Sequence, residues 1–402
     1  MNTKRAPKVR FKGFTDAWEQ RKLGNFGKTY TGLSGKTKDD FGHGKAQFIT
    51  YMNVYSNPII DVEMTEPIEI DLKQNEVEIG DVFFTTSSET PEEVGMSSVL
   101  LKKCGTVYLN SFCFGFRPFI ILDNYFLAYM LRAQVTRKQI ILLAQGISRY
   151  NISKNKVMEI NIFVPHDKEQ QQLGKFFYKL DNLITLHQRK LDKMKELKKA
   201  FLNLIFSQKL RFRGFTESWE LRKLKDITYP AGEKNRENLP LDSYSITNEH
   251  GFIPQDERFE NGGTMRETDK KMYYIVSPHS FAYNPARINI GSIGYQNTDK
   301  NVIVSSLYEV FKTSDDVDDR LLWYWFKSSY FQKLIEQFQE GGVRLYFYYD
   351  KLCMGTLSLP SFEEQHKIGK YLDTYDNLIT LRQEKINQLT KLKTTFLKNM
   401  FL

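Results

Sequence analysis

The chain has few of the residues that disulfide-bonded, metal-binding and membrane proteins need. Its 402 residues include three cysteines and six histidines, and neither type shows the spacing of disulfide partners or metal ligands. No apolar run approaches the roughly 18 residues of a membrane span, and the basic opening MNTKRAPKVRFKGF lacks the apolar segment of a signal peptide. We therefore expect a cytoplasmic protein without a metal site, in which Cys104, Cys113 and Cys353 are buried free thiols.

Complete catalytic motifs are missing as well. TGLSGKT at 31–37 approaches a phosphate-binding loop, but Tyr30 stands where the pattern requires a glycine. YNPA at 283–286 matches the Asn-Pro-Pro-aromatic motif of amino-methyltransferases only in part, because Ala286 replaces the second proline and no glycine-rich S-adenosylmethionine loop accompanies it. Carboxylates are plentiful but unclustered. The sequence therefore predicts no catalytic residue and no cofactor bound by this chain itself.

Positive charge, by contrast, is in excess. Lysine and arginine number 57 against 48 acidic residues, which gives a net charge of +9 and a pI near 9.1. Such a surplus favours polyanionic partners, because each phosphate that a basic side chain neutralises releases a condensed counterion. Charge alone leaves open a soluble protein with an incidental excess of lysine. The length and the 41% hydrophobic content indicate two or more ordinary packed domains.

Two sequence repeats give the chain its organisation. A short repeat reads RFKGFTDAWEQRKL at 10–23 and RFRGFTESWELRKL at 211–224. A long repeat covers 165–206 and 360–401, aligns without a gap at an offset of 195 residues, and contains the hexapeptide DNLITL in both copies. We expect the tryptophan of each short repeat to pack its domain against the long repeat, although contact with a partner protein is an alternative.

The segments between the repeats share little sequence with each other, yet both read as mixed domains. Strand-like runs such as VFFTT, FCFGFRPFI and NVIVSS alternate with turns, and helical stretches occupy corresponding late positions at 123–144 and 318–338. The predicted parts are a first mixed domain at 1–165, which includes the first short repeat, a helix at 166–209, a second mixed domain at 210–360 and a second helix at 361–402.

The long repeat predicts a helix with a heptad seam of about four repeats in each copy. About 36 helical residues would make a rod of roughly 54 Å. Each rod needs a partner for its apolar stripe. Because each helix leads back to a short repeat, we expect the two rods to pair antiparallel and close two similar halves into a ring; an external partner is the alternative. The predicted interface residues are Leu180, Ile184, Leu191 and Phe201 in the first helix and Tyr375, Ile379, Ile386 and Phe396 in the second.

Each variable segment ends in a loop that carries arginine, tyrosine and lysine. Arginine binds phosphate or reads guanine with two hydrogen bonds, and tyrosine stacks on bases, so we expect these loops to contact DNA. An ordinary surface loop is the alternative. Two weaker candidates are TTSSETPEEVGMS at 85–97 and YNPARINIGSIG at 283–294. The predicted DNA contacts are Thr85, Ser87, Arg149, Tyr150 and Lys154 in the first segment and Asn284, Arg287, Arg344, Tyr346 and Lys351 in the second.

The ordered duplication resembles the specificity (S, HsdS) subunit of type I restriction-modification systems over essentially the whole chain. The residues that carry the resemblance are the openings GFTDAWEQRKLG and GFTESWELRKLK, the helix beginnings PHDKEQQQLGKF and PSFEEQHKIGKY, and the long helices that follow. The resemblance implies an α+β fold with two mixed α/β target-recognition domains joined by two long antiparallel coiled-coil helices, related by an internal pseudo-two-fold repeat.

The resemblance also implies a division of labour. The chain would recognise a bipartite, asymmetric site on double-stranded DNA, while two methyltransferase (HsdM) subunits and two restriction and motor (HsdR) subunits supply the chemistry. S-adenosylmethionine, ATP and Mg²⁺ would belong to those partners. The alternatives are an enzyme with concealed methyltransferase or nuclease activity and a coiled-coil scaffold that does not bind DNA.

Overall fold

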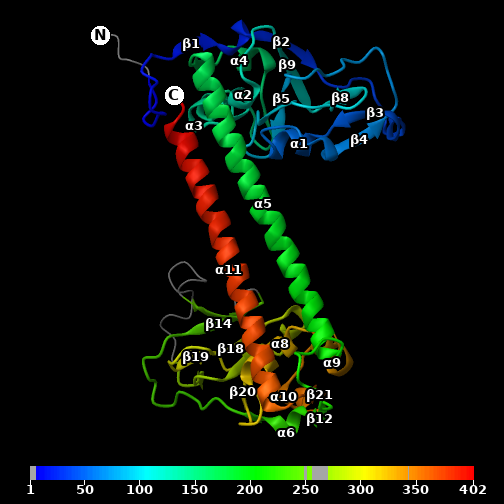
Figure 1. Cartoon of the computed structure of the whole chain (residues 1–402), viewed down its shortest axis with the longest axis vertical. Helices are drawn as coiled ribbons and strands as arrows, with labels where there is room; N and C mark the ends of the chain where they lie inside the picture. The colour runs from blue at the N-terminus through cyan, green and yellow to red at the C-terminus, as the bar shows by residue number, and fades with distance from the viewer. Residues whose placement is uncertain (1–5, 249–250, 256–269, 343) are drawn as a thin grey trace. The chain divides into compact units, whose positions relative to one another are not determined.

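The chain forms two compact units, and each unit combines one globular domain with parts of both long helices (Figure 1). Unit 1 comprises Met1–Gln188 and Glu384–Leu402, and unit 2 comprises Arg189–Gln383. The long helices are α5 (Asp167–Phe206) and α11 (Phe362–Asn399). The computed structural model describes residues 6–248, 251–255, 270–342 and 344–402.

The domain of unit 1 is built on a four-stranded antiparallel sheet in the order β2-β9-β5-β7. A second sheet has the order β4-β3-β8, and β1 pairs with β11 just before α5 begins. Strand β5 is buried on both faces, as its apolar sequence VFF predicts. The strands are β1 (Glu19–Lys22), β2 (Gly27–Thr31), β3 (Phe41–Ile49), β4 (Thr65–Ile68), β5 (Val82–Thr85), β6 (Ser87–Ser88), β7 (Ser97–Val99), β8 (Val107–Leu109), β9 (Cys113–Pro118), β10 (Tyr150–Asn151) and β11 (Asn161–Val164); the helices are α1 (Tyr51–Ser56), α2 (Asn124–Met130), α3 (Gln134–Ile141) and α4 (Lys154–Met158).

The domain of unit 2 repeats this plan. Its four-stranded antiparallel sheet has the order β13-β20-β17-β18, and β12 pairs with β21 just before α11 begins. The shared plan confirms the prediction that the two variable segments are copies of one fold. The strands are β12 (Glu220–Lys223), β13 (Thr228–Pro230), β14 (Tyr244–Thr247), β15 (Gly251–Pro254), β16 (Tyr274–Val276), β17 (Phe281–Tyr283), β18 (Ile293–Tyr295), β19 (Val302–Val304), β20 (Glu309–Thr313) and β21 (Thr356–Leu359); the helices are α6 (Leu224–Ile227), α8 (Asp319–Phe326), α9 (Ser329–Phe338), α10 (Tyr349–Cys353) and the 3₁₀ turn η5 (Ile288–Ile290).

Each helical stretch predicted near the end of a variable segment is two helices rather than one. In unit 1 the break between α2 and α3 falls at Arg132 and Ala133, where the backbone of Ala133 is extended. The buried Arg132 guanidinium donates hydrogen bonds to the carbonyl oxygens of Ser97, Val54, Tyr55 and Asn57. These long-range bonds hold the turn, and local helix propensity does not reveal them.

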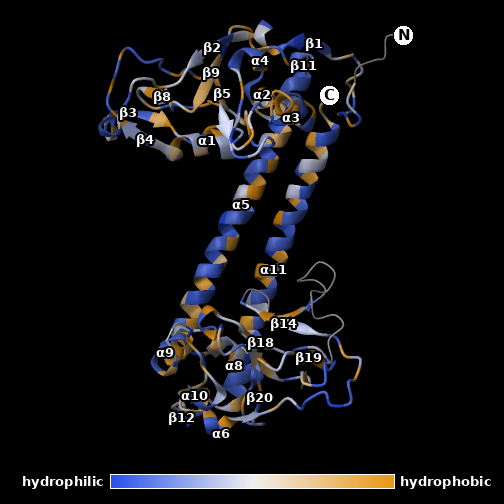
Figure 2. Ribbon diagram, turned by 180° about the vertical axis from the view of Figure 1, so that it is seen from behind, coloured by the Kyte–Doolittle hydropathy of each residue, from blue (hydrophilic) through white to orange (hydrophobic). Residues whose placement is uncertain are grey.

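The two long helices are antiparallel, as predicted. Within unit 1 the beginning of α5 lies beside the end of α11, where the rings of Phe176 and Phe396 are 5.3 Å apart. Within unit 2 the end of α5 lies beside the beginning of α11, where the rings of Phe201 and Tyr375 are 5.8 Å apart. Figure 2 shows that hydrophobic residues recur among hydrophilic ones along both helices. Of the predicted interface residues, Leu180, Leu191 and Ile386 are buried, and Ile184, Phe201, Tyr375, Ile379 and Phe396 are partly buried.

The end of each long helix completes the core of a domain that belongs to the other repeat. Met400 and Phe401, which follow α11, lie in the unit 1 core, where Phe401 contacts Trp18 and Phe126. Phe206 ends α5 and lies in the unit 2 core together with Trp219. Each domain therefore packs against the end of the other repeat's long helix, as the repeats predict, and both tryptophans have packing roles.

A repeated polar network fixes each domain to the helices. In unit 1, Arg10 donates two hydrogen bonds of 2.6 and 2.7 Å to Glu169, whose side chain is 1% exposed. Arg211 binds Glu364 in the same way in unit 2. The remaining equivalent contacts, each displaced by 195 residues, are Tyr129 with Asp181 and Tyr324 with Asp376, Lys393 with Asp181 and Lys198 with Asp376, and the side chains of Gln170 and Gln365 with the backbone of Asp123 and Asp318.

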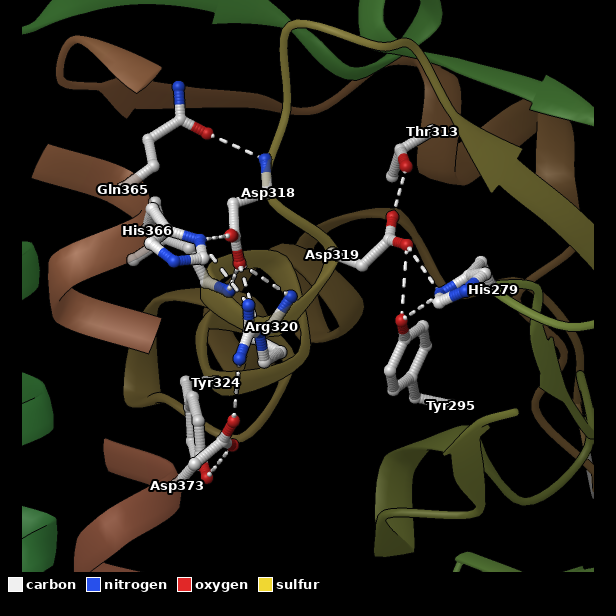
Figure 3. Close-up of polar contacts among 11 residues, drawn as sticks. His279, Tyr295, Thr313, Asp318, Asp319, Arg320, Tyr324, Gln365, His366 and Asp373 are labelled. Atoms are coloured by element: carbon white, nitrogen blue, oxygen red, sulfur yellow. Dashed lines mark hydrogen bonds and ion pairs between the residues drawn. The ribbon is translucent and has the colours of Figure 1, made fainter. Parts of the chain in front are cut away.

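A cluster within the unit 2 domain contains a partly buried carboxyl that is sensitive to pH. The Asp319 carboxylate accepts hydrogen bonds from Thr313 and Tyr295 and lies 3.7 Å from the imidazole of His279 (Figure 3). Burial raises the pKa of Asp319 above its ordinary value of 3.8, although these neighbours oppose the shift. The carboxyl therefore holds its proton more tightly in the folded chain than in the unfolded one.

Replacing Asp319 by asparagine is expected to change how stability depends on pH. The wild-type carboxyl contributes less to the free energy of unfolding as the pH rises from near 3.8 through its raised folded pKa. Between about pH 4 and pH 7 the difference in unfolding free energy should therefore shift in favour of Asp319→Asn. Urea unfolding at both pH values measures this difference, with Asp315→Asn as the control because Asp315 is exposed. A difference that is independent of pH would contradict the prediction.

The three cysteines do not share one environment. Cys113 is buried, as predicted, and burial raises the pKa of its thiol to about 12. Cys353 is partly buried, whereas Cys104 is exposed, which corrects the prediction for that residue: it follows Lys102 and Lys103 on a surface loop before β8. Among the described residues, no helix is long and apolar enough to cross a membrane, and no group of three or more potential metal ligands comes together.

Candidate nucleic-acid interface

The two predicted arginine loops are closed by the same pattern of paired backbone hydrogen bonds. In unit 1, Gln145 and Asn151 exchange two backbone hydrogen bonds of 2.9 Å, and Arg149 lies between them. In unit 2, Glu340 and Tyr346 exchange bonds of 2.8 and 2.7 Å around Arg344. We call residues 145–151 the first arginine loop and the loop closed by Glu340 and Tyr346 the second arginine loop. Arg149 and Arg344 are exposed at equivalent positions in the two domains.

A glycine makes each arginine loop possible. Gly146 and Gly341 have φ values of 145° and 134°, which favour glycine. A Cβ atom at either position would lie 2.0 Å from the carbonyl oxygen of Arg149 or Arg344. The glycine therefore permits the close approach of backbone that presents each arginine to solvent.

The structure brings the second predicted segment of each domain against its arginine loop. In unit 1 the backbone of Ile152 donates to Thr86, and β10 pairs with β6 just after β5. In unit 2 the backbone of Phe347 donates to Pro285, just after β17. Segments predicted separately from the sequence therefore form one surface in each domain.

The predicted contact residues of unit 1 differ in accessibility. Thr85 is 0% exposed, and its hydroxyl accepts a hydrogen bond from the backbone of Met96. This corrects the prediction for Thr85, because the residue ends a strand covered on both faces and its hydroxyl is used within the sheet. Ser87 is also largely buried but lines the pocket beside Arg149. Tyr150 and Lys154 are partly exposed.

The predicted residues of unit 2 form a polar and aromatic surface. Asn284 accepts a hydrogen bond from the backbone of Ala286 and stabilises the turn that leads to the exposed Arg287. The rings of Tyr346 and Tyr348 are stacked with their centroids 5.7 Å apart. Lys351 lies 2.6 Å from Glu340, and this hydrogen bond raises the pKa of Lys351. The lysine thereby braces the second arginine loop.

Sequence reasoning missed a pocket beside the first arginine loop. The pocket has a volume of about 610 Å³ and is lined by Arg149, Ser87, two tyrosines of α1, and Glu93. Tyr51 donates a hydrogen bond of 2.7 Å to the carbonyl oxygen of Ser87, and Tyr55 donates one of 2.6 Å to Glu93. The spacing of the two tyrosines in YMNVY places them one helical turn apart and was the available signal. The other lining residues are Met52, Ser88, Glu89, Phe112 and Ser148.

Unit 2 has a basic pocket where the segment after Arg287 meets α9. Its volume is about 720 Å³, and it contains three lysines, Lys199, Lys327 and Lys333, against one carboxylate, Glu336. The Lys327 ammonium lies 3.9 Å from the centre of the Trp323 ring, and desolvation together with nearby Lys198 lowers its pKa to about 8. Lys199 is more than a hundred residues from Lys327 and Lys333 in the sequence, and no run of adjacent charges indicates this pocket.

The two units correspond to two copies of one known domain. The type I restriction modification DNA specificity domain family matches residues 15–196 and 216–391, and the chain belongs to this family. Together the matches cover both halves of the internal repeat.

Two curated relatives of similar length are described as specificity subunits of type I restriction enzymes. The chain is 23% identical to the putative type I restriction enzyme MjaX specificity subunit of Methanocaldococcus jannaschii, over 94% of this chain and 91% of the relative. It is 24% identical to the type I restriction enzyme MjaVIII specificity subunit of the same organism, over 68% of each chain.

Solved structures share the fold. The S subunit of a type I restriction-modification system from M. genitalium aligns over 99% of both chains, with a TM-score of 0.61 and 14% identity. A chain from a structure that describes complex assembly and conformational transition of the type I system aligns over 94% of this chain and 96% of its own length, with a TM-score of 0.56 and 15% identity.

Proposed function

We propose that this chain is the non-catalytic subunit that gives a type I restriction-modification complex its specificity for a bipartite, asymmetric site on double-stranded DNA. The observation that carries the proposal is the pair of exposed arginines, Arg149 and Arg344, on equivalent glycine-dependent loops of two domains. The pockets of the two domains also differ: unit 1 has an acidic, aromatic pocket beside its arginine loop, and unit 2 has a basic pocket between the segment after Arg287 and α9. Unlike surfaces read unlike half-sites, so the target is asymmetric.

The repeated hexapeptide DNLITL supplies a docking surface for the methyltransferase subunits. In each copy two leucines point away from the helix seam and are largely exposed, although leucine is usually buried. The same side chains on two helices fit two copies of one partner, because identical partners bind identical surfaces. The exposed residues are Leu183 (39%), Leu186 (48%), Leu378 (49%) and Leu381 (61%).

The remaining chemistry belongs to other subunits in this proposal. Two HsdM subunits hold S-adenosylmethionine and methylate adenine, and two HsdR subunits use ATP and Mg²⁺ to move and cleave DNA. This chain contributes the positions of the two half-sites and the gap between them, which the paired helices set.

Mapping methylated adenines in cells that express the chain with its methyltransferase tests this function. A single bipartite motif with two different halves is the expected result, and a continuous or palindromic motif would refute it.

The purified chain alone, incubated with S-adenosylmethionine and DNA, should transfer no methyl group; transfer would identify a concealed enzyme. A scaffold without DNA contact predicts no salt-sensitive DNA binding in the assembled complex.

Lengthening the helices should lengthen the recognised gap. One heptad inserted at matching points of α5 and α11 adds about 10.5 Å to each, or roughly three base pairs of DNA at about 3.4 Å per pair. The methylated motif is expected to gain a gap of that size, or specific methylation is lost. A heptad inserted into α5 alone, between Asp181 and Lys198, serves as the control, because the unchanged α11 can then no longer pair with both residues at once through Lys393 and Asp376. If a folded double-insertion variant still methylates a motif with the original gap, the proposal that the paired helices set the gap is contradicted.

Lysines of the unit 2 pocket are expected to bind DNA phosphates. Lys333→Gln should weaken binding by a similar factor on every sequence and reduce the slope of log affinity against log salt by about 0.9, because one phosphate is no longer neutralised. Fluorescence titration of the assembled complex at several salt concentrations measures both effects. Glu336→Gln is the matched control from the same pocket and should strengthen binding. A loss confined to one DNA sequence would assign Lys333 to base reading instead.

A further inference from the structure

The pocket beside the first arginine loop has the size and walls of a binding site for a planar group. Its volume of about 610 Å³ lies within the range of small-molecule and base pockets. The rings of Tyr51 and Tyr55 are nearly parallel, at 15°, and Phe112 on the opposite segment is 57% exposed. Exposed aromatic faces at a DNA-facing loop are the surfaces on which bases stack.

The charges of the pocket exclude a phosphate as its occupant. Glu89 and Glu93 line the pocket together with one cation, Arg149. Two carboxylates repel a phosphate oxygen more than one exposed guanidinium attracts it. The pocket therefore suits a neutral group that donates hydrogen bonds, which distinguishes it from the lysine pocket of unit 2.

Glu93 is held in place for such a contact. The Tyr55 hydroxyl donates a hydrogen bond of 2.6 Å to one Glu93 oxygen, and this bond raises the pKa of Tyr55. An ionised carboxylate has about four acceptor positions and no donor, so Glu93 keeps acceptor capacity for a ligand. Among base edges in the major groove, the amino groups of cytosine (N4) and adenine (N6) donate, whereas guanine and thymine present acceptors.

We propose that this pocket receives the edge of one base of the first half-site and that Glu93, positioned by Tyr55, accepts a hydrogen bond from the exocyclic amino group of cytosine or adenine. Guanine and thymine are rejected at this position, because their oxygens would face a carboxylate. The proposal rests on the proposed function and adds to it a residue that determines specificity and the chemical class of base that it reads.

Base analogues that lack the amino group test the proposal directly. Once the methylated motif is mapped, each adenine of the first half-site is replaced in synthetic duplexes by purine and each cytosine by 2-pyrimidinone. The complex of the full chain with its methyltransferase is expected to lose roughly 5- to 150-fold in affinity at one such position. With Glu93→Ala the affinity for the natural duplex should fall by a similar factor, and the analogue at that position should cost nothing further.

Three variants make the result specific. Glu89→Ala removes the other pocket carboxylate and should leave the analogue penalty intact; loss of the penalty with this variant would overturn the assignment to Glu93. Arg287→Ala removes a predicted DNA contact of unit 2, so it should lower the overall affinity and leave the penalty of the analogue in the first half-site unchanged. Tyr55→Phe frees Glu93 without removing it and should reduce the analogue penalty, which also provides the test if Glu93→Ala does not fold.

The failure of this inference differs from failure of the proposed function. If the wild type binds its motif specifically but no analogue in the first half-site weakens binding, or if Glu93→Ala remains as sensitive to the analogue as the wild type, Glu93 does not read an amino group. If the complex binds every duplex equally, the proposed function itself is wrong.

Discussion

Replacing Phe401 by alanine is expected to lower the free energy of unfolding of unit 1 by about 3–5 kcal/mol, the usual cost of removing a buried phenylalanine side chain. The expectation is unusual because Phe401 follows the domain of unit 2 in sequence. Its ring nevertheless lies in the unit 1 core, with centroids 6.3 Å from Trp18 and 5.5 Å from Phe177. Alanine leaves a cavity among these rings that rigid neighbours fill only in part.

Hydrogen exchange resolved by peptide measures which unit loses protection. Peptides of the unit 1 sheet should exchange faster in Phe401→Ala, while those of the unit 2 sheet stay protected. Phe206→Ala is the matched control, because Phe206 occupies the corresponding place in the first long repeat and lies in the unit 2 core. The control should produce the opposite pattern. If Phe401→Ala instead lowered protection in the unit 2 sheet and Phe206→Ala in the unit 1 sheet, the assignment of each helix end to the core of the other repeat's domain would be contradicted.

Arg149→Ala and Arg344→Ala are expected to damage recognition of different half-sites. Each should lose about 1–3 kcal/mol of binding to the cognate duplex if the arginine contacts bases. Because Arg149 lies in unit 1 and Arg344 in unit 2, base changes in one half-site should no longer matter to one variant and still matter to the other. Competition binding with duplexes mutated in each half separately measures this effect.

Lysine substitutions separate base reading from charge. Arg149→Lys and Arg344→Lys keep the charge but lose the paired donors of the guanidinium, so they should lose nearly as much discrimination as the alanine variants. An equal loss on every sequence, together with recovery by lysine, would assign the arginines to phosphates instead of bases.

The architecture could be predicted from the sequence because the two copies of each repeat could be compared with each other. The two long repeats align without a gap at an offset of 195 residues, which predicted paired helices of equal length. The short repeat after the first helix predicted that each helix ends beside the domain of the other repeat. Phe401 beside Trp18 is the direct outcome of that reasoning. Periodicity and repetition can both be recognised in a single sequence.

Individual polar contacts between distant residues were beyond such reasoning. Arg10 and Glu169 are separated by 159 residues, and no local pattern marks them as partners. The same holds for the four carbonyl groups that bind Arg132 and break a stretch predicted as one helix. These polar contacts are fixed by the assembled fold rather than by neighbours in the chain.

The predicted nucleic-acid interface was likewise predictable only in part. Arg149 and Arg344 were found because glycine and arginine recur at one offset, but Thr85 was assigned to the surface although its strand is buried. A short strand such as VFFT shows no alternation that would tell a covered face from an open one. Glu93 and Tyr55 were missed because their pairing exists only once α1 packs beside the loop between β6 and β7.

The exchanged helix ends also govern the order in which the protein matures on the ribosome. The core of the domain that is synthesised first is complete only when Met400 and Phe401, which follow the whole second domain, have been added to the chain. The domain synthesised second receives Phe206 from a helix that already exists. All buried members of the unit 2 core, up to Leu372, therefore precede in sequence the last two buried members of the unit 1 core, although the unit 1 domain itself comes first in the chain.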